Sequence, residues 1–366
     1  MYFNNIYKGK KVFLTGHTGF KGSWLLSWLH MAGADILGYS LAPKPEHKLF
    51  GYINGEKLCD SVLYDVLAYE KLEKSMTAFQ PDFVFHLAAQ PLVRYGYEEP
   101  LETLYVNTMG TAHILNAMRK LTKPCVAIMV TTDKVYYNQE WPYAYRENDR
   151  LGGYDPYSSS KACAELIIDS YRNSYFNESA YSHHRKTIVA ARAGNVIGGG
   201  DWANDRIVPD IVRALENKQP IIVRNPKSVR PWQHVLEPIH AYLLLGQKLS
   251  EDPEEYHTEY NFGPDITDCL TVEEMVKHAI AIWKEGTYQI STPKDEPHEA
   301  GLLKLDISRA VSDLNWHPVF SAGEAMDKTI TWYKSFTGKN AEELVKKDIF
   351  DFTKRYSLQL KEGIRL

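Results

Sequence analysis

The chain of 366 residues is 44% hydrophobic and 24% charged, as expected of a globular protein with one large domain or two joined ones. Its 42 basic and 46 acidic side chains give a formal net charge of -4, which excludes a strong positive field for nucleic acid or an anionic membrane. Because the sequence has neither a leader-like apolar start nor an apolar run long enough to cross a bilayer, we expect a cytoplasmic protein.

Strand-like and helix-like segments alternate through the first two-thirds of the chain. Short apolar runs include KVFLTG, DFVFHLAA and CVAIMVTTD, and helical patterns such as KGSWLLSWLHMAGA lie between them. Strands that are apolar on both faces and alternate with helices predict a doubly wound parallel sheet, the α/β Rossmann architecture. The four cysteines stand far apart without paired spacing, so we expect neither a disulfide framework nor a metal site.

A glycine-rich turn, VFLTGHTGFKGSWLL, joins the first predicted strand to the first predicted helix. Glycines three residues apart suit a tight turn, a close approach of the backbone to a pyrophosphate, and packing of the helix on the strand. The N-terminus of the helix then faces the anion. The residues expected at this cofactor site are Gly16, Gly19, Phe20 and Gly22. His17 and Lys21 are further candidates for the pyrophosphate, with a solvated surface position as the alternative.

The next predicted strands offer further contacts to a dinucleotide. Asp65 can hold an adenine edge, although an ordinary loop carboxylate is the alternative. Small side chains leave room for the adenosine at Leu87, Ala88 and Ala89. The second strand ends without the acid that usually binds the ribose 2′-hydroxyl, so spacing alone leaves NAD and NADP open. The basic side chains that follow this strand are Lys44, His47 and Lys48.

Polar side chains follow the strand predicted at CVAIMV. Thr132 can hydrogen-bond a substrate hydroxyl at the carboxyl end of this strand, and Asp133 and Lys134 come next. Tyr157 and Lys161 lie one helical turn apart on the same face of a predicted helix. Because a neighbouring ammonium favours the phenolate, we expect a lowered pKa for Tyr157 and a role as general base. A turn carboxylate is the alternative for Asp133, and an exposed charge is the alternative for Lys134.

The pattern changes at about residue 195, where a glycine-rich loop precedes a helix, a short strand and loops rich in Pro, Trp and charge. We predict a dinucleotide-binding Rossmann domain over residues 1–194. Residues 195–366 are predicted to form mainly a smaller substrate-binding region, with some segments returning to the Rossmann domain. Since ligands bind at the carboxyl ends of the strands in such sheets, we expect the smaller region to pack there.

Several motifs together resemble the extended short-chain dehydrogenase/reductase family, and they span nearly the whole chain. They are Gly16-x-x-Gly19-x-x-Gly22, Asp65, LAAQ, the NTMGT segment that begins at Asn107, Thr132 and Tyr157-x-x-x-Lys161. Within that family, the segments GHTGFKGSWL, TTDKVY, GGGDWANDRIVPD and RPWQHVLEP are similar to the CDP-sugar group of the nucleotide-sugar 4,6-dehydratases. This resemblance adds Asn107 to the expected cofactor residues.

The resemblance implies NAD as cofactor, CDP-glucose as the small-molecule partner, and a lyase of deoxysugar biosynthesis for lipopolysaccharide O-antigen. Enzymes of this group oxidise C4 of the hexose by hydride transfer to NAD, remove water across C5 and C6, and return the hydride to C6. By this resemblance Tyr157 takes the C4 hydroxyl proton, Asp133 protonates the departing C6 hydroxyl, and Lys134 handles the C5 proton. Lys161 also holds the nicotinamide ribose. Thymidine-linked relatives carry glutamate where this chain has Lys134.

The second half of the chain supplies candidates for the nucleotide end of the substrate. Arginine suits a diphosphate better than lysine, because its guanidinium donates two parallel hydrogen bonds. The substrate-binding candidates are Asn195, Arg206, Arg224, Arg230, Trp232 and His298. Arg230 is the first choice for the diphosphate, with a surface ion pair as the alternative. An indole at Trp232 can stack on a base, although packing in the core is the alternative.

Two other functions fit parts of the pattern. A nucleotide-sugar 4-epimerase or reductase on the same fold needs only the Tyr-Lys-Thr set, which leaves Asp133 and Lys134 without a task. A dinucleotide-sensing regulator without catalysis would not need Tyr157 and Lys161. The resemblance also implies a homodimer, formed through a helical bundle that includes the Tyr157 helix and the segment NTMGTAHILNAMRKL. We expect its apolar face, at Ile114, Leu115 and Met118, to join the bundle.

Overall fold

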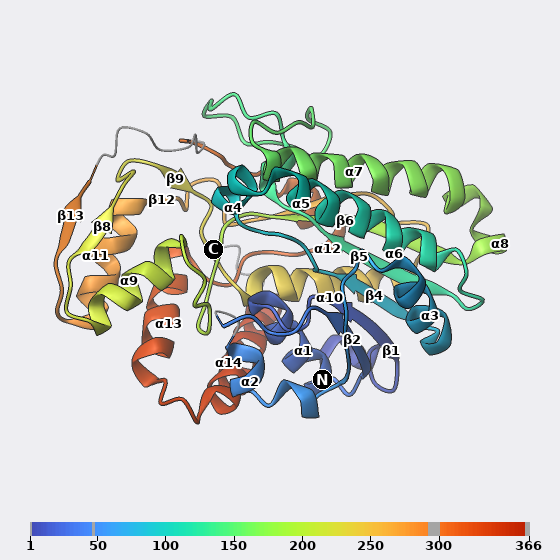
Figure 1. Ribbon diagram of the computed structural model, residues 1–366, viewed down its shortest axis with the longest axis horizontal. Helices are drawn as coiled ribbons and strands as arrows, with labels where there is room; N and C mark the ends of the chain where they lie inside the picture. Colours follow the sequence, from blue (N-terminus) through green and yellow to red (C-terminus); the bar gives the residue numbers. More distant parts are fainter. Residues whose placement is uncertain (1, 46–47, 292–300, 363–366) are drawn as a thin grey trace.

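The computed structural model describes residues 2–45, 48–291 and 301–362 of the chain (Figure 1). At its centre, seven parallel strands form one sheet in the order β11-β6-β5-β4-β1-β2-β3. The strands are β1 (Lys11–Thr15), β2 (Asp35–Ser40), β3 (Asp60–Leu63), β4 (Phe83–His86), β5 (Cys125–Val130), β6 (Lys186–Ala193) and β11 (Tyr260–Phe262). The predicted doubly wound parallel sheet is confirmed. Its strand order reverses between β1 and β4, so a ligand crevice is expected at their carboxyl ends.

Helices cover both faces of this sheet (Figure 1). Along β1, Val12 and Leu14 belong to one buried core, whereas Phe13 belongs to the other, as the alternation of side chains along a strand requires. The first core is shared with α1 (Phe20–Met31), α10 (Leu236–Glu251) and α14 (Ala341–Glu362). The second is shared with α3 (Tyr69–Phe79), α6 (Gly110–Met118) and α7 (Pro156–Tyr175). Both faces of the central sheet are therefore buried under helices.

The face of α6 that was expected to join a dimer bundle packs inward instead. Ile114, Leu115 and Met118 are fully buried in the core between α6 and the sheet. That expectation was wrong, because a helix that covers a sheet turns its strongest apolar stripe toward the strands.

A lobe at one end of the sheet consists of α9 (Ile207–Glu216), α11 (Val272–Trp283) and the strand pair β8 (Ile221–Val223) and β13 (Tyr288–Ile290) (Figure 1). α13 (Ala322–Ser335) packs against α11. Both α11 and α13 begin at capping boxes, formed by Thr271 with Glu274 and by Ser321 with Glu324. The second half of the chain thus builds the lobe and also supplies β11, α10 and α14 to the sheet layers. The domain boundary at residue 194 stays a prediction.

Shorter elements complete the chain. They are α2 (Leu49–Tyr52), α4 (Val93–Glu98), α5 (Pro100–Leu104), a π-helical turn (Tyr105–Met109), α8 (Tyr181–His184), α12 (Ser308–Leu314), the strand pairs β7 (Val196–Ile197) with β10 (Gln233–His234) and β9 (Val229–Arg230) with β12 (Leu270–Thr271), and 3₁₀ turns at Gly55–Lys57, Asp133–Val135 and Glu178–Ala180. None of the helices in the described part of the chain has both the length and the apolar character needed to cross a membrane. Within residues 2–45, 48–291 and 301–362, no group of three or more His, Cys, Asp or Glu side chains is placed to hold a metal.

Candidate active site

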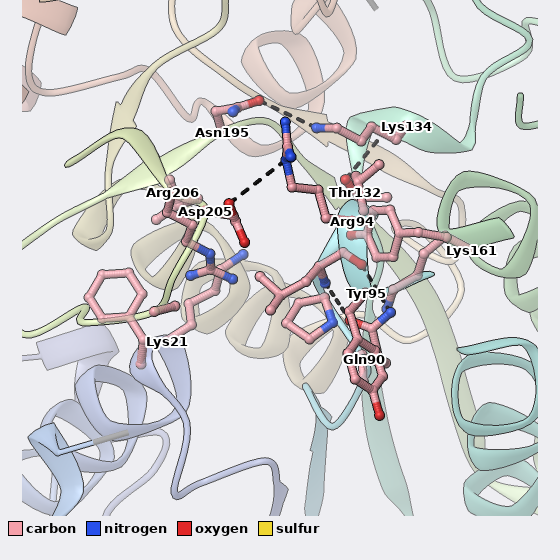
Figure 2. A pocket seen from close by; sticks show the side chains of 18 of the residues that line it. Lys21, Gln90, Arg94, Tyr95, Thr132, Lys134, Lys161, Asn195, Asp205 and Arg206 are labelled. Carbon is pink, nitrogen blue, oxygen red and sulfur yellow. Dashed lines mark hydrogen bonds and ion pairs between the residues drawn. The ribbon is translucent and has the colours of Figure 1, made fainter. Parts of the chain in front are cut away.

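A cavity of about 1190 Å³ lies between the carboxyl ends of the central strands and the lobe. Its walls come from the turn after β1, the segments after β2, β4 and β5, the start of α7, and the loops around α9. A pocket for one small ligand usually measures about 300–1,000 Å³, so this cavity has room for two ligands side by side. Figure 2 shows polar and charged side chains converging on it from several of these segments.

The glycine turn forms one end of the cavity. Gly16 has a φ of +73°, and a Cβ built there would lie 2.8 Å from the Ala88 nitrogen. A Cβ at Gly22 would lie 2.0 Å from the Gly16 oxygen, so the helix packs directly on the turn. Gly19 is the N-cap of α1 and has no side chain to accept hydrogen bonds from the first N–H groups of the helix. The cavity wall here therefore offers backbone donors to an anion.

Side chains beside the turn leave space for the rest of a dinucleotide. Leu87, Ala88 and Ala89 line the cavity after β4, and Asp65 lines it after β3. At the end of β2, the Ser40 hydroxyl lies 2.8 Å from the Thr18 hydroxyl, in the place where an acid usually meets a ribose. These residues fit a dinucleotide, with hydroxyl groups and not a carboxylate at its adenosine ribose.

The catalytic candidates after β5 meet at one point. Thr132 is the N-cap of the turn Asp133–Val135, and its hydroxyl donates to Asp133 Oδ1 at 2.9 Å. Asp133 is fully buried yet lines the cavity, and its Oδ2 has no hydrogen-bond partner among the described residues. Lys134 Nζ lies 3.5 Å from Asp133 Oδ1 and 3.5 Å from Asn195 Oδ1 (Figure 2). An acid and an amine therefore stand together, and one carboxylate oxygen has no hydrogen-bond partner among the described residues.

Tyr157 and Lys161 approach this point from the first turns of α7. The helix begins there because Asp155 accepts a hydrogen bond from the Ser158 nitrogen and Pro156 occupies the first helical position. Burial raises the pKa of Tyr157 to about 12, while a hydrogen bond with Thr132 and the charge of Arg206 oppose it. The expected lowering of this pKa by Lys161 was wrong for the protein alone, because desolvation of the phenol is the larger effect.

Burial also acts on Lys161, whose ammonium lies 3.4 Å from the Val130 carbonyl oxygen. It lowers the pKa of Lys161 to about 8, and the charge of Glu165 opposes this shift. Lys161 is therefore partly neutral near pH 8.

The lobe side of the cavity carries the arginines. Arg206 Nη1 lies 2.8 Å from Asp201 Oδ2, and Arg224 Nη2 lies 3.4 Å from Asp205 Oδ1. Arg230 is nearly buried, and its Nη1 donates to the Gly301 oxygen at 3.3 Å. All three arginines line the cavity. Several guanidinium groups around one space suit a diphosphate, and acidic partners hold Arg206 and Arg224 in place.

The family described as GDP-mannose 4,6 dehydratase matches residues 13–329 of this sequence. The chain belongs to this dehydratase family. Among curated relatives, the CDP-glucose 4,6-dehydratase of Salmonella typhimurium is 44% identical over 349 residues, covering 95% of this chain and 97% of that protein. The dTDP-D-glucose 4,6-dehydratase of Mus musculus is 27% identical and covers 91% and 92%. The resemblance noted in the sequence motifs is confirmed.

Solved structures share the fold of this dehydratase-family chain. The UDP-glucose 4-epimerase of Thermotoga maritima, solved with UDP-glucose, has a TM-score of 0.75 and 19% identity, covering 88% of this chain and 98% of that one. The dTDP-glucose 4,6-dehydratase of Bacillus anthracis, solved in complex with NAD, has a TM-score of 0.74 and 18% identity, covering 89% and 97%. At these identities the likeness shows the fold alone.

Most of the predicted site residues of this dehydratase-family chain lie on the cavity, but some do not. The His17 side chain lies beneath the glycine turn, fully buried, with Nε2 2.7 Å from Ser61 Oγ, so it does not reach a pyrophosphate. Burial lowers the pKa of His17 to about 4. Asn107 is also buried behind the cavity, where it binds the Gln90 backbone and donates to Ser160 Oγ at 2.8 Å. Both side chains therefore contact neighbouring residues behind the cavity wall and do not line the cavity.

Two further predicted residues, Trp232 and His298, and two basic candidates, Lys44 and His47, differ in their placement. Trp232 lines the cavity, but it is nearly buried and its Nε1 donates to the Leu270 oxygen at 3.3 Å, which favours packing over stacking on a base. His298 lies outside the described residues, as does His47 among the basic residues after β2. Lys44 does line the cavity.

Sequence reasoning missed Arg94 as a site residue. It comes from α4 and lines the cavity, with Nε 3.8 Å from Asp205 Oδ1 (Figure 2). The arginine stands in the segment PLVRYGYEEP, which has neither a glycine-rich turn nor a polar residue directly after a predicted strand. A charged residue at every fourth position is ordinary for a surface helix, so only the fold reveals that this one faces the ligand space.

Proposed function

We propose that this protein is a CDP-glucose 4,6-dehydratase, an NAD-dependent lyase that converts CDP-D-glucose to CDP-4-keto-6-deoxy-D-glucose and water. The observation that carries the proposal is Asp133, a buried carboxylate on the cavity wall whose Oδ2 has no partner among the described residues. Its position between Thr132 and Lys134 provides the acid that elimination of water requires. The relative of that name in Salmonella typhimurium supports the choice of substrate. The sequence features favour the cytoplasm as the place of this reaction.

Each of three cavity side chains, Tyr157, Asp133 and Lys134, handles proton transfer at one position of the hexose. The glycine turn and residues 87–89 would hold NAD, which would supply a hydride acceptor at C4, a hydride donor at C6 and the positive charge of its nicotinamide ring. Tyr157 accepts the proton of the C4 hydroxyl in its phenolate form, which an ammonium at Lys161 and a cationic nicotinamide ring would favour, and its oxygen hydrogen-bonds with Thr132. Asp133 donates a proton to the departing C6 oxygen. Lys134 takes the C5 proton and later returns it.

The close pairing of Lys134 with Asp133 suits both of their tasks. Lys134 Nζ lies 3.5 Å from Asp133 Oδ1, so a group that can take the C5 proton and a group that can give a proton to the C6 oxygen stand side by side. Water then departs with the proton from Asp133, while Lys134 holds the proton from C5. The pair is therefore suited to elimination without an external acid or base.

Incubation of the purified protein with a panel of nucleotide hexoses tests the proposal. CDP-glucose with NAD is expected to yield a product with the alkaline absorbance of a 4-keto-6-deoxy sugar, while NADP supports lower activity. Conversion of a nucleotide hexose to its C4 epimer without that absorbance would instead establish an epimerase, the function named for the Thermotoga maritima neighbour.

Replacing Arg230 by alanine is expected to raise KM for CDP-glucose by about tenfold or more, because a lost charged hydrogen bond costs about 1.5–3 kcal/mol. The change in kcat is expected to be smaller, since a diphosphate contact exists in both ground and transition states. Steady-state kinetics measure both values. Arg213→Ala serves as the control, because Arg213 hydrogen-bonds to Asp210 and the Trp202 oxygen and does not line the cavity. An unchanged KM in the Arg230 variant would remove this residue from the diphosphate site.

We also propose a homodimer, formed through α5, the π-helical turn and α7. Leu101, Tyr105 and Met109 are exposed and four residues apart, so they share one side of a continuous helical segment. Leu166 is exposed on α7, which packs beside α5. Such a stripe of large apolar side chains is typical of a helix bundle between two copies of a chain.

Sedimentation equilibrium at micromolar concentration is expected to give twice the mass of one chain. Leu101→Arg is expected to shift the protein toward the monomer, because a charge in an apolar helix interface is left without a partner. Phe350→Arg is the matched control, since Phe350 is also well exposed but lies on α14, away from this stripe. A monomer mass for the unaltered protein would reject the dimer.

A further inference from the structure

A buried ion pair lies behind the catalytic side chains. Glu165 on α7 and Arg192 on β6 form a bidentate pair, with Nε 3.0 Å from Oε1 and Nη2 2.9 Å from Oε2. Their side chains are only 4% exposed. Neither residue lines the cavity, so the pair does not touch a ligand.

The pair connects segments that carry the catalytic residues. Glu165 accepts a hydrogen bond from the Thr131 hydroxyl, directly before Thr132 at the end of β5. Arg192 Nη1 donates to the Tyr136 hydroxyl at 2.8 Å and to the Glu147 carbonyl oxygen at 2.7 Å. Through these contacts β5, the turn after it, α7 and β6 meet at one guanidinium and one carboxylate.

Stability alone does not account for such a pair. A buried ion pair is often no more stabilising than apolar residues of the same volume, because both charges lose their hydration. What it does provide is fixed geometry, since a bidentate pair holds both side chains in one orientation. Glu165 stands one helical turn after Lys161, and Tyr136 follows the turn that contains Asp133 and Lys134. The register of α7 against the end of β5 is therefore set at this pair.

Glu165 also contributes charge to the site. Burial lowers the pKa of Lys161, and the Glu165 carboxylate is the group that opposes this effect. Other titratable groups near Lys161 are Tyr157 on the same helix, His86 on β4 and Lys21 on α1. Burial lowers the pKa of His86 to about 3 and that of Lys21 to about 7, so both are mainly neutral at pH 8. Among these groups, Glu165 is the one whose charge favours the ammonium form of Lys161.

We propose that Glu165 and Arg192 are positioning residues for the dehydratase reaction, which hold Tyr157 and Lys161 in register with Thr132 and Asp133. This inference rests on the proposed function, because it assigns those four residues to catalysis. Glu165 acts through Lys161 and Thr131 and makes no contact with substrate or cofactor.

Glu165→Gln tests the proposal, because it removes the charge and nearly keeps the shape. The expected result is a fall in kcat of about tenfold to a hundredfold, as for a small misplacement of catalytic groups, with KM for CDP-glucose within about threefold of the unaltered protein. The second readout needs no turnover: competitive acetylation of Lys161, followed by mass spectrometry across pH. Since Glu165 raises the pKa of Lys161, the variant is expected to titrate at a lower pH, below about 8.

Glu259→Gln is the matched control. Glu259 pairs with Arg172, also on α7, at 3.1 Å between Oε2 and Nη2, and both lie away from the cavity. This variant is expected to lose thermal stability while kcat and the titration of Lys161 stay unchanged. If Glu259→Gln lowers kcat as much as Glu165→Gln does, the effect is general loosening of α7 and the proposal fails.

Glu165→Asp carries the test if the glutamine variant does not fold. It keeps the negative charge in a shorter side chain, so Lys161 is expected to titrate as in the unaltered protein while kcat still falls. Normal kcat in this variant would overturn the positioning role. If the unaltered protein does not convert CDP-glucose, the proposed function is refuted. If the titration of Lys161 is unchanged in Glu165→Gln, the positioning role of Glu165 is refuted even though the proposed function stands.

Discussion

Replacing Tyr157 by phenylalanine is expected to lower the turnover of CDP-glucose by about a hundredfold or more, the usual effect of losing a general base. The ring is almost fully buried at the start of α7, so phenylalanine fills the same space. Only the hydroxyl is lost, together with its hydrogen bond to Thr132. Binding of CDP-glucose, measured by calorimetric titration, is therefore expected to change by no more than a few-fold.

A control on the same helix separates chemistry from packing. Tyr171→Phe removes a phenol hydroxyl from α7 at a position that does not line the cavity, and it is expected to leave turnover unchanged. A Tyr157→Phe variant that retains more than about a tenth of normal turnover would exclude the role of general base.

Periodicity and strand-end signals predicted much of this architecture. The glycine turn, the strand-helix alternation and the polar residues after β5 all reflect local rules, because each depends on the backbone or on neighbours within a few positions. The parallel sheet and the meeting of Thr132 with Tyr157 followed from those rules. In contrast, the sequence pattern assigned the apolar face of α6 to a dimer, because a stripe at Ile114 and Met118 looks the same whether a sheet or a second chain covers it.

Properties that depend on burial could not be predicted from spacing. Tyr157 and Lys161 are four positions apart, which indicates that they are neighbours on a helix, but the pKa of Tyr157 is raised because the whole fold removes water from the phenol. The position of His17 shows the same limit. Its position inside a phosphate-binding motif predicts a contact with the phosphate. In the fold, however, the His17 ring is buried against β2 and β3, beside Ser61. Arg94 is the reverse case, an ordinary helix arginine that the fold turns toward the ligand.

Replacing Asp133 is expected to separate the oxidation at C4 from the later elimination of water. In Asp133→Asn the oxidation at C4 is expected to proceed, because Tyr157 and Thr132 remain, but the C6 oxygen lacks its proton donor. Asparagine has the same shape and can keep the hydrogen bond from Thr132, so the turn after β5 is expected to persist. Formation of the 4-keto-6-deoxy product is expected to fall by about a hundredfold or more.

Stopped-flow absorbance gives the decisive measurement for Asp133. On mixing the Asp133→Asn variant with CDP-glucose, the nicotinamide band of the reduced cofactor is expected to rise and persist, since the hydride cannot return to C6 before water has left. The unaltered protein is expected to show only a small transient. Asp169→Asn, an exposed change on α7 beside Arg172, should behave like the unaltered protein. If the Asp133 variant is inactive but the band stays flat, the block precedes oxidation. In that case the carboxylate serves to orient Thr132 and Lys134, and elimination must draw its proton from another group.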